Sequence, residues 1–195
     1  MNKFNFAKLD CPKHIKYQFK YCPFCGEKDS LIFDDIKVFN CSKCGRSYFV
    51  NPSSAVGIIV DTPKGIVFVL RKFEPKKDYI DMPGGFCEPY ERIEDSIKRE
   101  LFEETAIKLD NVNFLMSGSN EYIYENLMYI TSDIYFYAKL DYIPKVKPSD
   151  DALEVVFIEK ENIDFNKIAF ESSKEALNFY FKFFYKPLDK KFKIS

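Results

Sequence analysis

The stretch GGFCEPYERIEDSIKRELFEETAI, residues Gly84 to Ile107, decides the fold: it predicts a glycine turn followed by a helix that is dense in acidic residues. Glu100, Glu103 and Glu104 are spaced by three and four residues, which places them on one face of that helix. Like charges at this spacing repel, so a cation is expected to compensate them. Clustered carboxylates suit hard divalent ions such as Mg2+, which bind oxygen ligands. A solvated acidic face is the alternative interpretation.

A second face of the same helix is apolar. Ile93, Ile97 and Leu101 recur every four residues, which predicts that this face packs on the core. Glu91 stands at the expected start of the helix, where the helix dipole favours an acid. The helix is therefore anchored on one side and presents its acids to a cleft on another.

The same stretch carries a family pattern. From Gly85 onward it follows Gly-x5-Glu-x7-Arg-Glu-U-x-Glu-Glu-x-Gly-U, where U is a bulky aliphatic residue, and so resembles the signature of the Nudix hydrolases. Ala106 stands where the family has its last glycine. The matching positions are Gly85, Glu91, Arg99, Glu100, Leu101, Glu103, Glu104 and Ile107. The resemblance implies an α/β (α+β) fold, a Nudix-type α/β/α sandwich around a mixed β-sheet.

This resemblance also implies the chemistry. It implies a pyrophosphohydrolase in which Mg2+ or Mn2+ is held by Glu100, Glu103 and Glu104, with a contribution from the Gly85 carbonyl. Arg99 is expected to pair with a helix acid and to orient it, and Glu100, Glu103 and Arg99 form the expected catalytic set. Such chemistry needs a cation to neutralise charge on the phosphoryl oxygens and a group that activates water.

The general base is left open by the sequence. Glu100 is one candidate, and an acid from a later segment is another. The later candidates are Glu121, Asp150, Asp151 and Glu154. Asp and Glu are the groups to consider because His14 is the only histidine and precedes the main domain, which argues against Ser–His or Cys–His nucleophiles.

Two cysteine pairs indicate a metal site of another kind. CPFCG contains Cys22 and Cys25, and CSKCG contains Cys41 and Cys44. Four thiolates at C-x2-C-x15-C-x2-C predict a closed tetrahedral Zn2+ site with a structural role. The module resembles a zinc ribbon, with LIFDDIKVF as its hairpin.

Three further residues could bind metal but have simpler interpretations. Cys11 and His14, in CPKH, are additional candidates, although the ribbon already has four ligands. Cys87 lies within the acidic stretch, where a small apolar filler is the favoured interpretation.

The order of the modules narrows the resemblance. A zinc ribbon followed by the Nudix pattern is similar to the NADH pyrophosphatase group over most of residues 20–160. That group's SQPWPFPxS element is absent, and GSNEYIYENLMY stands in its place. The substrate is thus open among NADH, ADP-ribose, dinucleoside polyphosphates and nucleotide sugars. Ala106 and the missing element motivate an alternative, a non-catalytic nucleotide-binding regulator on a Nudix fold.

Composition sets the domain organisation and the partners. With 195 residues, 46% of them hydrophobic, the chain can bury one core and carry a small module: residues 1–50 form the zinc ribbon segment and 51–195 the hydrolase domain. Residues 1–50 hold nine Lys or Arg and five Asp or Glu, an excess too small to predict nucleic-acid binding. A nucleotide is the expected partner, a homodimer is left open, and the lack of an apolar span or signal segment predicts a cytoplasmic protein away from membranes.

The remaining elements follow from periodicity. AVGIIVD and IVFVLR predict a strand pair, LEVVFIE a last strand, and 172–185 a closing helix that packs on the sheet. In TSDIYFYAKL, Ile134 and Phe136 share one face while Asp133 and Tyr135 share the other, which predicts a half-buried strand. Arg71 ends IVFVLR, where it could either reach a phosphate or lie in solvent.

Overall fold

The computed structural model of the protein describes residues 15–33, 38–148 and 152–185. Four predicted candidates, Cys11, His14, Asp150 and Asp151, lie outside these ranges. None of the helices in the described ranges is both long and apolar enough to span a membrane.

The chain divides into two compact units. The smaller unit comprises Met1–Ser53 and Glu121–Thr131, and the larger unit comprises Ser54–Asn120 and Ser132–Ser195. The hairpin of strands β8 (Asn113–Tyr124) and β9 (Leu127–Lys139) runs from the larger unit into the smaller one and back.

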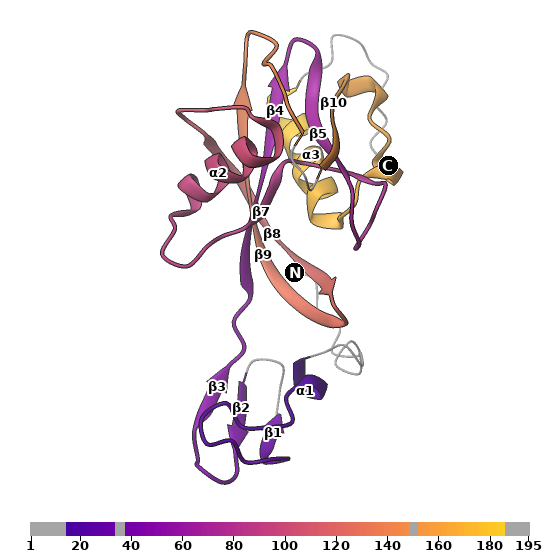
Figure 1. The fold of residues 1–195 in the computed structure, drawn as a ribbon. Coiled ribbons are helices and arrows are strands. Elements are labelled where there is room, and N and C mark those ends of the chain that lie inside the picture. The colour runs from indigo at the N-terminus through magenta and orange to yellow at the C-terminus, as the bar shows by residue number, and fades with distance from the viewer. Residues whose placement is uncertain (1–14, 34–37, 149–151, 186–195) are drawn as a thin grey trace. The chain divides into compact units, whose positions relative to one another are not determined.

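The larger unit is built on a mixed sheet whose main strand order is β10-β5-β4-β9-β8 (Figure 1). Two short strands extend it, since β6 pairs with β5 and β7 pairs with β4. The bounds are β4 Ser53–Thr62, β5 Gly65–Arg71, β6 Ile80–Asp81, β7 Gly84–Phe86 and β10 Ala152–Ile158. The predicted strand pair is confirmed, because β4 and β5 are antiparallel and join at Thr62 and Gly65.

Helices cover both faces of this sheet. One apolar cluster joins alternate β4 residues such as Ile58 to Ile97 and Leu101 of helix α2 (Ile93–Thr105). The other joins Ile59 to Leu177 of helix α3 (Glu171–Phe184). Two short 3-10 turns, at Lys160–Asn162 and Phe165–Lys167, lead into α3. Because neighbouring residues of one strand point to opposite clusters, the architecture is the expected α/β/α sandwich.

Strand β9 corrects one prediction. We predicted that it is half-buried, but Asp133 and Tyr135 are only 7% and 5% exposed, and Phe136 on the opposite face is also buried. The polar residues at these positions do not face solvent because α3 covers them: the Tyr135 hydroxyl donates to Ser172 of that helix, 2.9 Å away. Alternating polarity indicates a solvated face only when no second layer supplies polar partners.

Helix α2 begins and ends close to the predicted positions. Its apolar face is confirmed, since Ile97 and Leu101 are fully buried. The helix ends at Ala106, which adopts the left-handed conformation with φ 63° and ψ 11° and donates its N–H to the Phe102 carbonyl at 2.8 Å. A glycine is the usual residue at such a position because it has no Cβ that opposes a positive φ.

We therefore expect Ala106→Gly to stabilise the protein by about 1 kcal/mol, because glycine removes the strain of the left-handed backbone. The shift in the midpoint of urea unfolding measures it. Ala176→Gly is the matched control: Ala176 is fully buried within α3, where glycine costs helix propensity and packing and should lower the midpoint. A midpoint that falls in both variants would contradict the assignment of strain to Ala106.

The smaller unit contains a three-stranded antiparallel sheet, β1 (Leu31–Phe33), β2 (Val38–Cys41) and β3 (Ser47–Phe49), after the short helix α1 (Ile15–Gln18). The pairing of β1 with β2 confirms the predicted hairpin between the cysteine pairs. Among the described residues of this unit, Phe39 is the one fully buried aromatic ring; it is 1% exposed and stacks on Tyr48 with centroids 4.8 Å apart. So small an apolar core gives little stability alone.

Candidate functional site

Two consecutive glycines in the turn before α2 lie in close contact with neighbouring atoms, Gly84 with backbone and Gly85 with the Glu100 carboxylate. A Cβ on Gly84 would lie 2.0 Å from the carbonyl oxygen of Val56, and a Cβ on Gly85 would lie 2.5 Å from the carboxyl carbon of Glu100. Because Gly84 has no side chain, β7 can pair with β4. Because Gly85 has none, the Glu100 carboxylate can lie directly against the turn. The two glycines thus bring the turn and the acidic face of α2 into contact.

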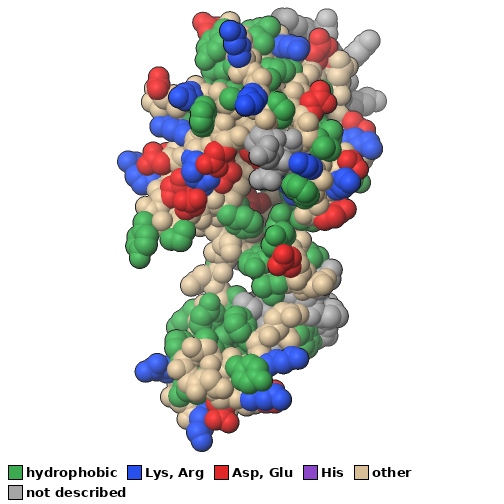
Figure 2. Space-filling model, in the orientation of Figure 1, with side chains coloured by type: hydrophobic (Ala, Val, Ile, Leu, Met, Phe, Trp, Pro, Cys, Tyr) green, Lys and Arg blue, Asp and Glu red, His purple; other side chains and the backbone are tan. Residues whose placement is uncertain are grey.

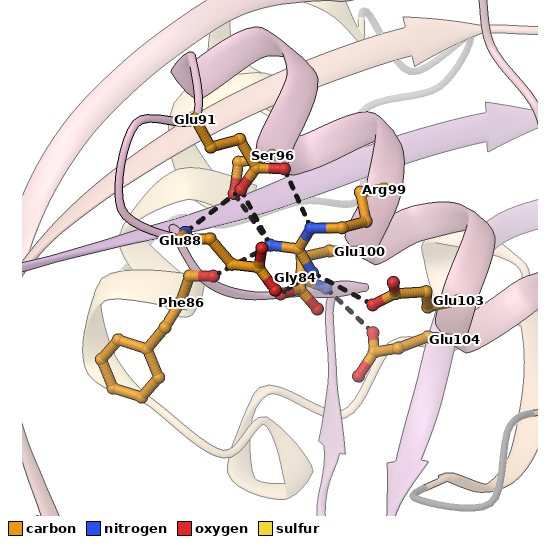
Figure 3. Close-up of polar contacts among 9 residues, drawn as sticks. All are labelled: Gly84, Phe86, Glu88, Glu91, Ser96, Arg99, Glu100, Glu103 and Glu104. Atoms are coloured by element: carbon orange, nitrogen blue, oxygen red, sulfur yellow. Dashed lines mark hydrogen bonds and ion pairs between the residues drawn. The ribbon is translucent and has the colours of Figure 1, made fainter.

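Arg99 is the hub of the acidic cluster (Figure 3). Its guanidinium forms a two-fold contact with Glu91, with Nε and Nη2 each 2.9 Å from a carboxylate oxygen. Its Nη1 donates to Glu100 at 2.8 Å and to Glu103 at 3.0 Å. Its Nη2 also donates to the Phe86 carbonyl at 3.2 Å. One cation therefore fixes three acids and the turn.

These contacts shift the protonation of the acid at the helix start. Hydrogen bonds from Arg99 lower the pKa of Glu91 to about 2, so this carboxylate stays charged across the physiological range. The same acids raise the pKa of Arg99, which keeps its own charge. Glu91 therefore holds Arg99, and Arg99 in turn holds Glu100 and Glu103.

Glu104 has a different environment. It is partly buried, and its Oε2 accepts the Gly84 N–H at 2.9 Å. Desolvation raises its pKa to about 8, and the charge of Glu100 adds to this shift. Desolvation also raises the pKa of Glu100, against the opposing effect of Arg99. Burial thus disfavours the charged form of two of the acids, and a cation bound beside them would stabilise that form.

Comparison with known proteins identifies the family. The family model described as the NUDIX domain matches residues 51–178, which is more than half of the chain. The chain belongs to the Nudix family.

Two curated relatives are similar to this Nudix chain. The NAD-capped RNA hydrolase NudC of Haemophilus influenzae is 31% identical over 117 residues, which cover 58% of this chain and 42% of the relative. The ADP-ribose pyrophosphatase of Methanocaldococcus jannaschii is 30% identical over 127 residues, covering 65% and 72%. The match thus spans about two fifths of the length of the NudC relatives.

Among solved structures, a NUDIX hydrolase from Nitrosomonas europaea matches with a TM-score of 0.65. It covers 84% of this chain and 91% of the other at 24% identity. At that identity the likeness concerns the fold alone, and it agrees with the sandwich described above.

The carboxylate groups of the Nudix helix are of the chemical type that binds divalent cations. Carboxylate oxygens are the ligands that Mg2+ and Mn2+ prefer, and acidic side chains gather over the α2 region in Figure 2. Arg99 already compensates Glu100 and Glu103, so Glu104 is the acid whose charge lacks a cation in direct contact within the described ranges. A divalent ion bound here would contact two acids that Arg99 already neutralises in part. The acid that it would stabilise most is therefore Glu104.

The pH dependence of stability tests the environment of Glu104. Its pKa is about 8 in the folded protein against an ordinary value of 4.5, so the folded state binds more protons between these values. Without divalent cations, stability should therefore fall as pH rises through this window, by on the order of 3 kcal/mol. Asp81, whose pKa burial raises to about 6, contributes with the same sign at lower pH.

The measurement is the urea midpoint in a chelating buffer at about pH 5.5 and about pH 8.5. Glu104→Gln is the control, because Gln keeps the acceptor for Gly84 and removes the titration, so its midpoint should change much less over the same range. A steeper loss in Glu104→Gln than in the natural chain would contradict the raised pKa. Saturating Mg2+ should restore the natural chain at the higher pH.

The four cysteines come together in the smaller unit. Their sulfur atoms all lie within 4.8 Å of one another, and Cys22, Cys25, Cys41 and Cys44 are the only set of three or more Cys, His, Asp or Glu ligand atoms this close among the described residues. A hydrogen bond with Ser30, at 3.3 Å, and the Cys44 N–H lower the pKa of the Cys41 thiol to about 6. Four sulfurs at this spacing fit a tetrahedral thiolate site.

The remaining predicted candidates differ in their surroundings. Glu154 is exposed on β10, and Glu121 is exposed on β8 in the smaller unit. Arg71 was a candidate for phosphate contact, but its Nη1 lies 3.6 Å from the buried Asp81 and its guanidinium packs over the Phe170 ring. Sequence reasoning passed over Asp81, although an acid between Ile80 and Met82, directly before the glycine turn, was a usable signal.

Proposed function

We propose that the chain is a metal-dependent hydrolase that cleaves the pyrophosphate bond of a nucleoside diphosphate linked to another group. The observation that carries this proposal is the poorly solvated Glu104 carboxylate, held by Gly84 beside acids that Arg99 orders. The two curated relatives are named as a hydrolase of NAD-capped RNA and as an ADP-ribose pyrophosphatase. Both names support hydrolysis over a purely regulatory role.

In this proposal Glu100, Glu103 and Glu104, with the Gly85 carbonyl, hold Mg2+ or Mn2+. The cation would supply positive charge against the phosphoryl oxygens of the substrate. Arg99 keeps Glu100 and Glu103 in one orientation through its contacts of 2.8 and 3.0 Å. The proton of the attacking water passes to an acid, and the candidates remain Glu100, Glu121, Asp150, Asp151 and Glu154.

The smaller unit has a structural role in the proposal. Cys22, Cys25, Cys41 and Cys44 bind one Zn2+, which stabilises residues 1–50, while residues 51–195 form the hydrolase domain. The clustering of the four sulfurs supports the zinc assignment.

A substrate panel tests the function. The protein is incubated with Mg2+ or Mn2+ and, separately, with ADP-ribose, NADH, a dinucleoside polyphosphate, a nucleotide sugar and an NAD-capped RNA, and the products are identified by mass spectrometry. The expected result is a nucleoside monophosphate, or an RNA 5′-monophosphate, from at least one of them. Tight binding of a nucleotide by calorimetry without cleavage of any would overturn the proposal and favour a regulator.

A further inference from the structure

Two buried carboxylates on the α3 side of the sheet are joined by a chain of hydroxyl groups. Ser173 donates to Asp81 Oδ1 at 2.8 Å, and Ser172 donates to Asp133 Oδ2 at 2.6 Å. The Tyr135 hydroxyl lies between them, 2.9 Å from the Ser172 oxygen and 3.3 Å from that of Ser173. Each of the five residues is 9% exposed or less.

Stability alone is a poor explanation for this chain. Buried carboxylates lose their hydration, and apolar side chains of similar volume often stabilise a core as well or better. The polar atoms are nevertheless all satisfied, since no buried side-chain nitrogen or oxygen in the described residues lacks a partner. A satisfied polar network holds its members in one arrangement. We therefore ask which neighbouring residues this arrangement positions.

The arrangement leads directly to the glycine turn. Asp81 Oδ1 also accepts the Met82 N–H at 2.9 Å, and its Oδ2 faces Arg71 at 3.6 Å, so both oxygens are engaged. The next residue, Pro83, accepts the Ile58 N–H of β4 at 3.0 Å. The residue after it, Gly84, donates to Glu104 at 2.9 Å.

Three consecutive residues after Asp81 thus each make one fixed contact, and the last contact is with Glu104. The Asp81 carboxylate orients the first peptide of the turn, and the turn aims the Gly84 N–H. Ser173 is the only one of these contacts that comes from α3, 92 residues away in sequence. It connects the helix on one face of the sheet to the acid on the other.

We propose that Ser173 is a positioning residue for Glu104: through Asp81 and the turn, it sets the carboxylate at the place where the cation binds. This inference rests on the proposed function, which gives Glu104 that role. Ser173 itself touches neither substrate nor cation. Loss of its hydroxyl removes one of the three contacts of the Asp81 carboxylate and should loosen it, so that the Gly84 N–H and the Glu104 carboxylate are held less firmly in one orientation.

The test measures Mn2+ binding without substrate, from the electron paramagnetic resonance signal of free Mn2+. We expect Ser173→Ala to weaken Mn2+ binding by about tenfold, the usual effect when a residue that orients a ligand is removed. Ser173→Cys keeps a similar volume and a weak donor, so it should fold like the natural chain and give an intermediate affinity. In assays with substrate, the Mg2+ concentration for half-maximal rate should rise in the same order.

Ser172→Ala is the matched control. Ser172 lies in the same turn of α3, is equally buried, and bonds to Asp133 instead of Asp81. It should lower the melting temperature about as much as Ser173→Ala but leave the Mn2+ affinity within about twofold. Equal loss of affinity in both alanine variants, or no loss in Ser173→Ala and Ser173→Cys, overturns the inference.

This outcome is separate from that of the proposed function. If no nucleotide of the panel is cleaved but Mn2+ affinity follows the expected order, the positioning role stands and the hydrolase proposal falls. If nucleotides are cleaved and the affinities of the natural chain and both Ser173 variants are equal, the hydrolase proposal stands and the positioning role falls.

Discussion

Glu104→Gln is expected to lower kcat/KM for the best nucleotide of the panel by about a thousandfold while the fold is retained. A charged ligand of a catalytic cation contributes several kcal/mol to transition-state stabilisation, and each 1.4 kcal/mol is about a factor of ten. The folded state should survive because Gln still accepts the Gly84 N–H that now reaches Glu104 Oε2 at 2.9 Å. At pH 8 the variant should even be more stable than the cation-free natural chain. In the natural chain the ionised, poorly solvated Glu104 destabilises the folded state, and Gln has no such charge.

Glu94→Gln is the matched control for that loss. Glu94 lies in the first turn of the same helix, half exposed, and its ion pair is with Arg92 at 3.8 Å. It removes one negative charge from α2 without touching Arg99 or the turn. Its kcat/KM should stay within about twofold of the natural value, because exposed ion pairs contribute little. Full activity in Glu104→Gln would remove this acid from the cation site.

Removal of zinc should have the second large effect, confined to the smaller unit. Structural zinc contributes on the order of 10 kcal/mol or more to the folding of small thiolate modules. Within the part of that unit which the structure describes, Phe39 is the one fully buried aromatic ring, so the apolar core cannot replace that contribution. Cys41→Ser should therefore abolish zinc binding, measured as metal per chain by mass spectrometry, and expose residues 21–49 to rapid proteolysis.

Cys87→Ser provides the comparison. Cys87 is a partly buried cysteine that packs against the α2-side cluster of the larger unit, outside the group of four sulfurs. This variant should keep about one zinc per chain and the natural pattern of proteolysis. If Cys41→Ser also kept one zinc and stayed resistant to protease, the four cysteines would not form a zinc site.

Much of the fold could be predicted because it follows from local periodicity. The apolar repeat at Ile97 and Leu101 specified the buried face of α2, and both are fully buried. The two cysteine pairs specified that four sulfurs converge, since each knuckle needs only a tight turn. Such features depend on residues that are near one another in sequence, so the pattern contains the information.

The polar interior could not be predicted in the same way. Asp133 and Tyr135 looked like a solvated face because their partners, Ser172 and Ser173, come from a helix almost forty residues later. The sequence left Arg71 open between a phosphate contact and solvent, whereas its guanidinium lies against Asp81 and the Phe170 ring. Whether a polar residue is exposed or satisfied in the interior is decided by tertiary packing, which a single strand's alternation does not encode.

The contact between Gly85 and the Glu100 carboxylate has a consequence for how this sequence can diverge. A side chain at 85 would meet the acid at 100, and the contact is relieved when that acid is shortened or its carboxylate moves off the turn. The constraint runs one way: a shorter residue at 100 leaves Gly85 without a clash, whereas a side chain at 85 displaces the acid that Arg99 orders. A side chain in the turn at 85 is therefore tolerated most readily where the acid fifteen residues later has already been shortened.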